Sequence, residues 1–194
     1  MRIMTLIFAS IAILFFPSCL KINYLGSIAK VECPRFSPIK IIENTPQISI
    51  ISNRCDDYTY KSEKVYEAIQ HFVEEFAYEF EVEEKSVWIM LAGLKIQFSA
   101  VPREAKNVYD VRGKFYEKHA VSGLALDKNW VWVETRTRYI CESSLVHELV
   151  HIIIWRTQGA HGDPDHEGGE FSGWTEQHTE LISLTNEVLC ELGI

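Results

Sequence analysis

Hydrophobic residues recur at helical spacing in three segments of the chain. In residues 62–84, large apolar side chains return every three or four positions with acidic residues between them, which predicts an amphipathic helix. Residues 145–158 are strongly apolar, with apolar residues nearly all round the expected helix, as is typical of a helix in the middle of a fold. A pair of serines precedes this segment as a suitable N-cap, and Gly159 follows it as a suitable end. A third helix is expected over residues 174–192.

Short apolar or alternating runs elsewhere in the chain predict β-strands. These runs occupy residues 47–52, 87–91, 94–100, 121–126 and 130–137. The last two flank an Asp-Lys-Asn sequence at 127–129, which is a suitable hairpin turn. Residues 102–118 are more polar and are interpreted as a loop. The order of these elements predicts an α+β fold with a first helix, a small, mostly antiparallel sheet, a core helix and a closing C-terminal helix.

The N-terminal residues are typical of an export signal. Arg2 precedes an almost unbroken apolar run of about 14 residues, whereas a membrane-spanning helix needs about 20. The run ends in Phe-Pro-Ser-Cys at residues 16–19, and here the chain resembles a bacterial lipoprotein signal. That resemblance implies a signal peptide at 1–18 and a lipid on Cys19 that anchors the protein to a membrane of the cell envelope. A plain secreted form and an uncleaved anchor are the alternatives.

The rest of the chain divides into a proline-containing, irregular arm at 19–60 and one domain at 61–194. The net charge of −8 for the whole chain and the lack of a face dense in Lys and Arg argue against nucleic acid as a partner.

Four cysteines remain when Cys19 is set aside, an even number that suits an oxidising compartment. Two disulfides are therefore plausible, and three pairings are possible. The pairing of nearest partners, Cys33 with Cys55 and Cys141 with Cys190, is weakly favoured. The alternative is that some of them are small buried hydrophobic residues.

The sequence His147-Glu148-Leu-Val-His151 carries the candidate chemistry. Residues four apart project from the same face of a helix, so the two imidazoles can reach one Zn²⁺ ion. The neighbouring Glu148 can then act as general base towards a zinc-activated water without binding the metal. A core helix has little reason to carry three ionisable groups unless a metal compensates for their burial. The alternative is a partly exposed helix with ordinary polar residues.

At these residues the chain resembles the zincin-type metallopeptidases, over roughly residues 121–192. The resemblance implies a zincin-like fold and zinc-dependent hydrolysis of peptide bonds in a peptide or protein substrate. In that family a strand near the active-site helix, commonly the sheet edge, binds extended substrate by strand addition. The segment 130–137 is the candidate here, with an ordinary interior strand as the equal alternative.

A catalytic zinc site needs a third protein ligand. The positions that hold a glycine and a third histidine in metzincins are Ile154 and Thr157, so the ligand is expected from the polar loop or the last helix. His166 is preferred, because it lies in a turn-rich segment after the helix. The rival ligands are Glu170, His161 and Glu176. Asp163 or Asp165 would accept a hydrogen bond from a metal-binding histidine and so fix its tautomer.

The remaining expectations concern the reaction. His178 and Tyr139 are possible donors to the tetrahedral oxyanion.

The main expectation is a zinc metallopeptidase at the bacterial cell envelope. The alternatives are a non-catalytic envelope lipoprotein that binds metal or a partner, and a zinc enzyme that acts on a non-peptide amide. Glu148 favours the enzyme, because a structural metal site has no use for that carboxylate.

Overall fold

The computed structural model describes residues 35–39, 47–52, 60–99, 103–109, 115–159 and 173–194. Its helices and strands follow one another along the chain as follows: β1 (Arg35–Ile39), β2 (Ile48–Ser52), α1 (Ser62–Glu79), α2 (Glu84–Leu91), β3 (Lys95–Ser99), β4 (Arg103–Tyr109), β5 (Phe115–Val121), β6 (Gly123–Asp127), β7 (Trp130–Glu134), the 3₁₀ turn η2 (Ile140–Glu142), α3 (Leu145–Gln158) and α5 (Glu176–Glu191). The α+β class is therefore confirmed.

One five-stranded sheet forms the base of the fold, in the order β1-β2-β3-β7-β6. Strands β2, β3 and β7 are parallel to one another, whereas β1 and β6 run antiparallel to their neighbours. The sheet is thus mixed, whereas a mostly antiparallel sheet was expected. Strand β7 pairs on both sides, so the interior alternative for residues 130–137 is correct and the edge assignment is wrong. Within the described residues the edge beside α3 is β6.

Two sequence expectations about secondary structure are wrong. Residues 87–91 belong to helix α2, not to a strand, and Val87 and Leu91 are buried from one helical face. The polar segment 102–118 contains strand β4 and the first part of β5, and within the described residues these two strands pair with each other in a separate two-stranded sheet. The two strands of such an antiparallel pair satisfy each other's backbone hydrogen bonds.

The other predicted elements are confirmed with small changes at their ends, including the hairpin turn between β6 and β7. Strands β1 and β2 extend the main sheet into the segment that was expected to form an irregular arm. The predicted signal peptide and Cys19 lie outside the described residues. In the part of the chain that the structure describes, no helix has the length and apolar character needed to cross a membrane.

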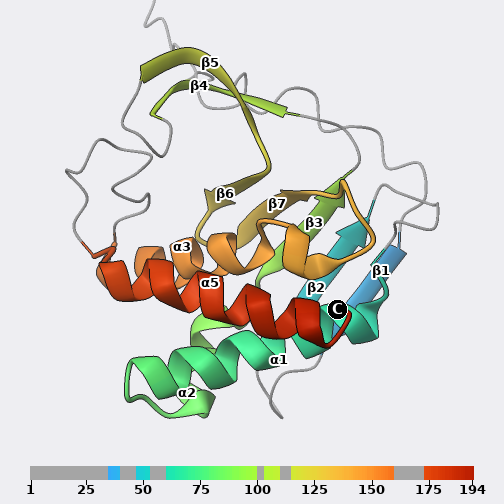
Figure 1. Cartoon of the computed structure of the whole chain (residues 1–194), viewed down its shortest axis with the longest axis vertical. Coiled ribbons are helices and arrows are strands. Elements are labelled where there is room, and N and C mark those ends of the chain that lie inside the picture. The colour runs from blue at the N-terminus through green and yellow to red at the C-terminus, as the bar shows by residue number, and fades with distance from the viewer. Residues whose placement is uncertain (1–34, 40–46, 53–59, 100–102, 110–114, 160–172) are drawn as a thin grey trace, which may run out of the picture.

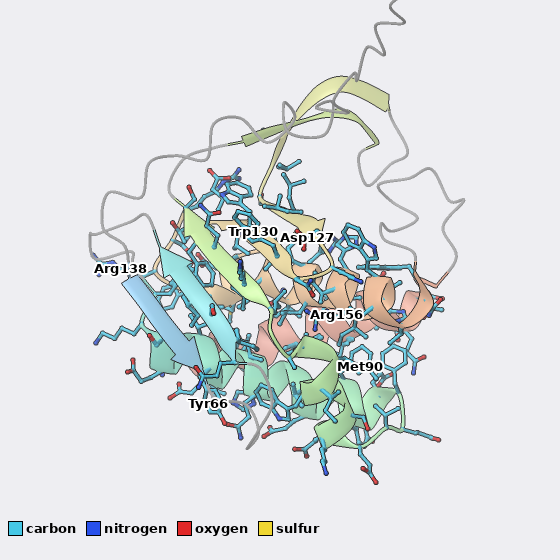
Figure 2. The ribbon with its side chains drawn as sticks, turned by 180° about the vertical axis from the view of Figure 1, so that it is seen from behind. Tyr66, Met90, Asp127, Trp130, Arg138 and Arg156 are labelled. Atoms are coloured by element: carbon cyan, nitrogen blue, oxygen red, sulfur yellow. A yellow bond between two sulfur atoms is a disulfide. The ribbon has the colours of Figure 1, made fainter. Side chains whose placement is uncertain are left out.

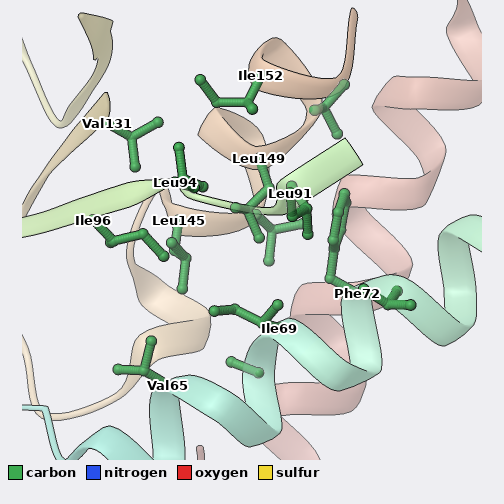
Figure 3. Packing of buried hydrophobic residues seen from close by; sticks show 14 of the residues in the cluster. Val65, Ile69, Phe72, Leu91, Leu94, Ile96, Val131, Leu145, Leu149 and Ile152 are labelled. Carbon is green, nitrogen blue, oxygen red and sulfur yellow. The ribbon is translucent and has the colours of Figure 1, made fainter. Parts of the chain in front are cut away.

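The four helices of the described residues lie on one side of the sheet, and the view from behind has the strands in front of them (Figures 1 and 2). Helix α3 lies between the sheet and the outer helices, which explains why it is apolar on nearly every side. Figure 3 shows Leu145 and Leu149 of α3 between strand residues and the inward face of α1, with Ile152 farther from α1; the other labelled side chains include Ile96 and Val131 of the sheet, and Val65, Ile69 and Phe72 of α1.

A disulfide joins Cys141 of η2 to Cys190 near the end of α5, which confirms one of the two expected bridges. The backbone N–H of Cys141 also donates to the carbonyl of Ile194, so the C-terminus is fixed to the segment that precedes α3. The second expected pair, Cys33 with Cys55, lies outside the described residues.

Arg156 fixes the other end of α3 to two neighbouring elements. Its guanidinium donates to the carbonyls of Met90 and Ala92 at the end of α2. It also donates to the carbonyl of Lys128 at 2.6 Å and to the side chain of Asn129 at 3.0 Å, both in the β6–β7 turn. Figure 2 shows Arg156 between Met90 and the end of β6. Helix α3 is therefore held at both ends.

Candidate metal centre

The ends of helix α3 follow from its flanking residues. The hydroxyl of Ser143 accepts the N–H of Leu145 at 3.3 Å, and the hydroxyl of Ser144 donates to the carbonyl of Ser122 at 2.8 Å. Gly159 adopts a left-handed conformation with φ of 71°, which a glycine adopts without strain, and its N–H donates to the carbonyl of Trp155. Both predicted ends of the helix are confirmed.

His147 and His151 lie on the same face of α3 and point towards one location. Their Nε2 atoms are 2.9 Å apart, and their ring centroids are 4.7 Å apart at an interplanar angle of 74°. His151 is 6% exposed, whereas His147 is half-buried. The two rings therefore converge through the nitrogen atoms that imidazole commonly offers to a metal.

The spacing of these nitrogens can be compared with that of a tetrahedral zinc site. Two ligands at about 2.05 Å from the metal and at the tetrahedral angle are about 3.3 Å apart. The separation in the structure is within half an ångström of that value, so a slight opening of the rings would admit the ion. The chemistry and placement of this donor pair fit zinc.

Glu148 is 4% exposed and lies against the edge strand β6. A Cβ atom at Gly123 would lie 2.8 Å from the carboxyl carbon of Glu148, and closer still to its Oε1 atom. The carboxylate thus occupies space that any other residue at position 123 would take. Glu148 directly follows His147 in the chain, and its carboxylate faces β6 at Gly123.

Trp174 packs against both histidines. Its ring centroid is 5.3 Å from that of His147 and 4.9 Å from that of His151. The indole N–H donates to the hydroxyl of Thr179 at 3.0 Å, which fixes the rotation of the ring. Trp174 thereby restricts the positions that the two imidazoles can take.

His178 lies in the first turn of α5 and completes its N-terminal cap. Its Nδ1 atom accepts the backbone N–H of Thr175 at 3.0 Å, while the Thr175 side chain accepts the N–H of residue 178. Because the backbone N–H donates to Nδ1, the neutral ring carries its proton on Nε2. Burial among aromatic rings lowers the pKa of His178 from 6.5 to about 4. The ring is consequently neutral at pH 7.

The other candidate residues are placed as follows. Glu176 is exposed at the start of α5. Tyr139 is half-exposed, and its carbonyl accepts a hydrogen bond from the hydroxyl of Tyr60. Within the residues that the structure describes, no three His, Cys, Asp or Glu side chains form a group that could hold a metal. The remaining third-ligand and supporting candidates lie outside the described residues: His161, Asp163, Asp165, His166 and Glu170.

Two residues at this site, Gly123 and Trp174, were not identified from the sequence as functional. An isolated glycine in a strand commonly marks the close approach of another group, so a close contact at Gly123 could have been predicted from the sequence. From the sequence, residue 174 was assigned only to the start of the last helix, which was expected over residues 174–192. Its contact with the histidines depends on tertiary structure, which no local pattern indicates.

Comparison of the chain with models of protein families, with curated proteins and with solved structures gave no match.

Proposed function

We propose that this protein is a zinc-dependent hydrolase of peptide bonds that acts at the bacterial cell envelope. The observation that carries the proposal is the convergence of two Nε2 atoms, 2.9 Å apart, on a helix that also carries the buried Glu148. Imidazole nitrogens are common zinc ligands, and two of them four residues apart on a helix can share one cation. The fold class and the position of the helix in the core agree with the resemblance to zincins.

The Nε2 atoms of His147 and His151 would hold the zinc ion. When bound, zinc supplies a Lewis acid that polarises the scissile carbonyl and lowers the pKa of water to about 7. Trp174 limits the motion of both imidazoles, and a histidine pair that is already oriented loses less entropy on binding a cation. We retain His166 as the proposed third ligand.

The ends of the segment 160–172 support a ligand from that part of the chain. Gly159 ends α3, and Gly173 lies against Gln158 so closely that a Cβ at 173 would be 2.8 Å from the Gln158 carboxamide carbon. The described residues that flank the segment, Gly159 and Gly173, therefore both lie at the C-terminal end of α3, and Trp174 follows Gly173 in the chain.

Glu148 supplies the proton transfers. Its carboxylate accepts a proton from the attacking water and later gives it to the nitrogen of the leaving amine. Burial in contact with β6 limits the positions that the carboxylate can take, and a catalytic group that is held in place loses less entropy in the reaction. The neighbouring edge of β6 suits an extended peptide that adds to the sheet as a further strand. Anchoring through a lipid on Cys19 completes the proposal.

Glu148→Gln tests the general base. The variant should bind zinc as the wild type does, and its cleavage of a proteome-derived peptide library, followed by mass spectrometry, should fall by at least a hundredfold. Glu142→Gln is the matched control, because Glu142 is exposed three residues before the start of α3 and should keep full activity.

Unchanged cleavage by Glu148→Gln would refute the assignment of the base. A wild-type protein that binds zinc but cleaves no peptide would favour the non-catalytic metal-binding alternative.

A further inference from the structure

Strand β6 is tied to the first turn of helix α3 through one carbonyl. The carbonyl of Ser122 accepts the backbone N–H of Glu134 at 2.7 Å and the hydroxyl of Ser144 at 2.8 Å. The first of these bonds joins the start of β6 to β7, and the second joins it to the N-cap residue of α3. The backbone at Gly123 is therefore fixed next to the helix.

Gly123 lies on the helix-facing side of the sheet. It is paired with Val133, whose side chain belongs to the buried core between sheet and helices. A Cβ at Gly123 would lie 2.8 Å from the carboxyl carbon of Glu148, and it would come closer than that to both Glu148 Oε1 and the hydroxyl oxygen of Ser144. Real Cβ atoms essentially never approach other heavy atoms within 3.0 Å.

The close contact at Gly123 concerns space and not backbone conformation, because a Cβ there would displace the side chains of Glu148 and Ser144. Among the described residues, the glycines with positive φ are Gly93, Gly159, Gly173 and Gly193, and Gly123 is outside this set. Any residue could adopt its backbone conformation, and strands generally disfavour glycine. The contact with α3 is thus the feature that calls for a residue without a side chain.

We infer that Gly123 is a positioning residue for Glu148: by presenting bare backbone, it lets the carboxylate lie against the edge strand. The role of this carboxylate as a general base rests on the proposed function, whereas the contact itself does not. The three atoms nearest to a Cβ at Gly123 belong to Glu148 and Ser144 and not to either histidine. Gly123 should therefore affect proton transfer separately from metal binding.

The melting temperatures of a set of variants test the contact without any measurement of activity. Gly123→Ala is compared in four metal-free backgrounds: wild type, Ser144→Ala, Glu148→Ala, and Ser144→Ala with Glu148→Ala. Overpacking should lower the melting temperature by about 5 °C in the wild type. The decrease should shrink in each single background and fall below about 1 °C in the double background, where both obstructing side chains are gone.

An equal decrease in all four backgrounds would overturn the inference. If Gly123→Ala alone does not fold, the version with both truncations should still fold, and its failure to do so would also overturn it.

Kinetics separate positioning from metal binding. Gly123→Ala in the Ser144→Ala background is compared with Ser144→Ala alone, so that Glu148 is the remaining obstructing side chain. Zinc affinity and KM should stay within about twofold, while kcat falls at least tenfold, since a 1 Å displacement of a catalytic group can cost about a hundredfold. Loss of zinc affinity in parallel with kcat would overturn the inference. If the wild type cleaves nothing, the proposed function fails, and the melting temperatures alone decide whether Gly123 positions Glu148.

Discussion

The protonation of His178 should make the stability of this protein depend on pH in a measurable way. The ring is 5% exposed, and its closest aromatic neighbours are Phe80 at 4.5 Å and Trp174 at 5.8 Å between centroids. Its Nδ1 atom accepts a backbone N–H, so a proton can be added there only if the cap of α5 is broken. Burial accordingly lowers the pKa to about 4.

The sign follows from proton binding in the two states. Between pH 6.5 and 4 the unfolded chain binds a proton at residue 178 and the folded chain does not, so the free energy of unfolding decreases as pH falls. The contribution is fully present above pH 6.5 and is lost as pH falls towards 4. For pKa values of 6.5 unfolded and about 4 folded, the loss between pH 7.5 and 4.5 is about 2.5 kcal/mol.

His178→Gln is the matched variant. Glutamine at this position keeps the reciprocal cap with Thr175 but does not titrate. Urea denaturation at pH 7.5 and 4.5, with a chelator present so that metal binding does not contribute, gives the free energy of unfolding for both proteins. The wild type should lose about 2.5 kcal/mol more than the variant over this range. Equal losses would refute the assignment of a buried, neutral His178.

Three further predictions concern stability and the histidine pair. Replacing Cys141 and Cys190 with serine should lower the free energy of unfolding by about 4 kcal/mol, as the loop of 49 residues implies. A serine variant with the same urea midpoint as the oxidised wild type would contradict this. Arg156→Met should cost about 2 kcal/mol, measured in the same way, because it leaves carbonyls of α2 and of the β6–β7 turn without their donor; no change would contradict that role. Trp174→Ala should weaken zinc binding roughly tenfold in calorimetry, since both imidazoles lose the ring that restrains them, and unaltered affinity would count against this role.

Local signals were sufficient to predict helix α3 and its ends. The apolar run, the serines before it and Gly159 after it all act within a few residues of the chain. The β6–β7 hairpin was predictable for the same reason, because its turn carries Asp and Asn: Asp127 accepts the N–H of Asn129 at 2.7 Å. The placement of His147 and His151 on one face then followed from helix geometry alone.

Features that depend on long-range pairing were not predictable. A five-residue apolar run at 87–91 fits a strand or one side of a short helix equally well, and packing selects the helix. The strand order places β7 inside the sheet through its pairing with β3, which lies more than 30 residues earlier in the chain. The contacts of Gly123 and Trp174 with the candidate site depend on this topology.

The most direct test of the account is the zinc content of the purified protein, measured together with that of histidine variants. The account predicts about one zinc per chain in the wild type and in the His71→Ala control, whose histidine lies on α1 in an ion pair with Glu74. His147→Ala and His151→Ala should each lose the metal. A wild-type protein that takes up no zinc, or variants that retain it with unchanged affinity, would contradict the central claim that these two imidazoles share one ion.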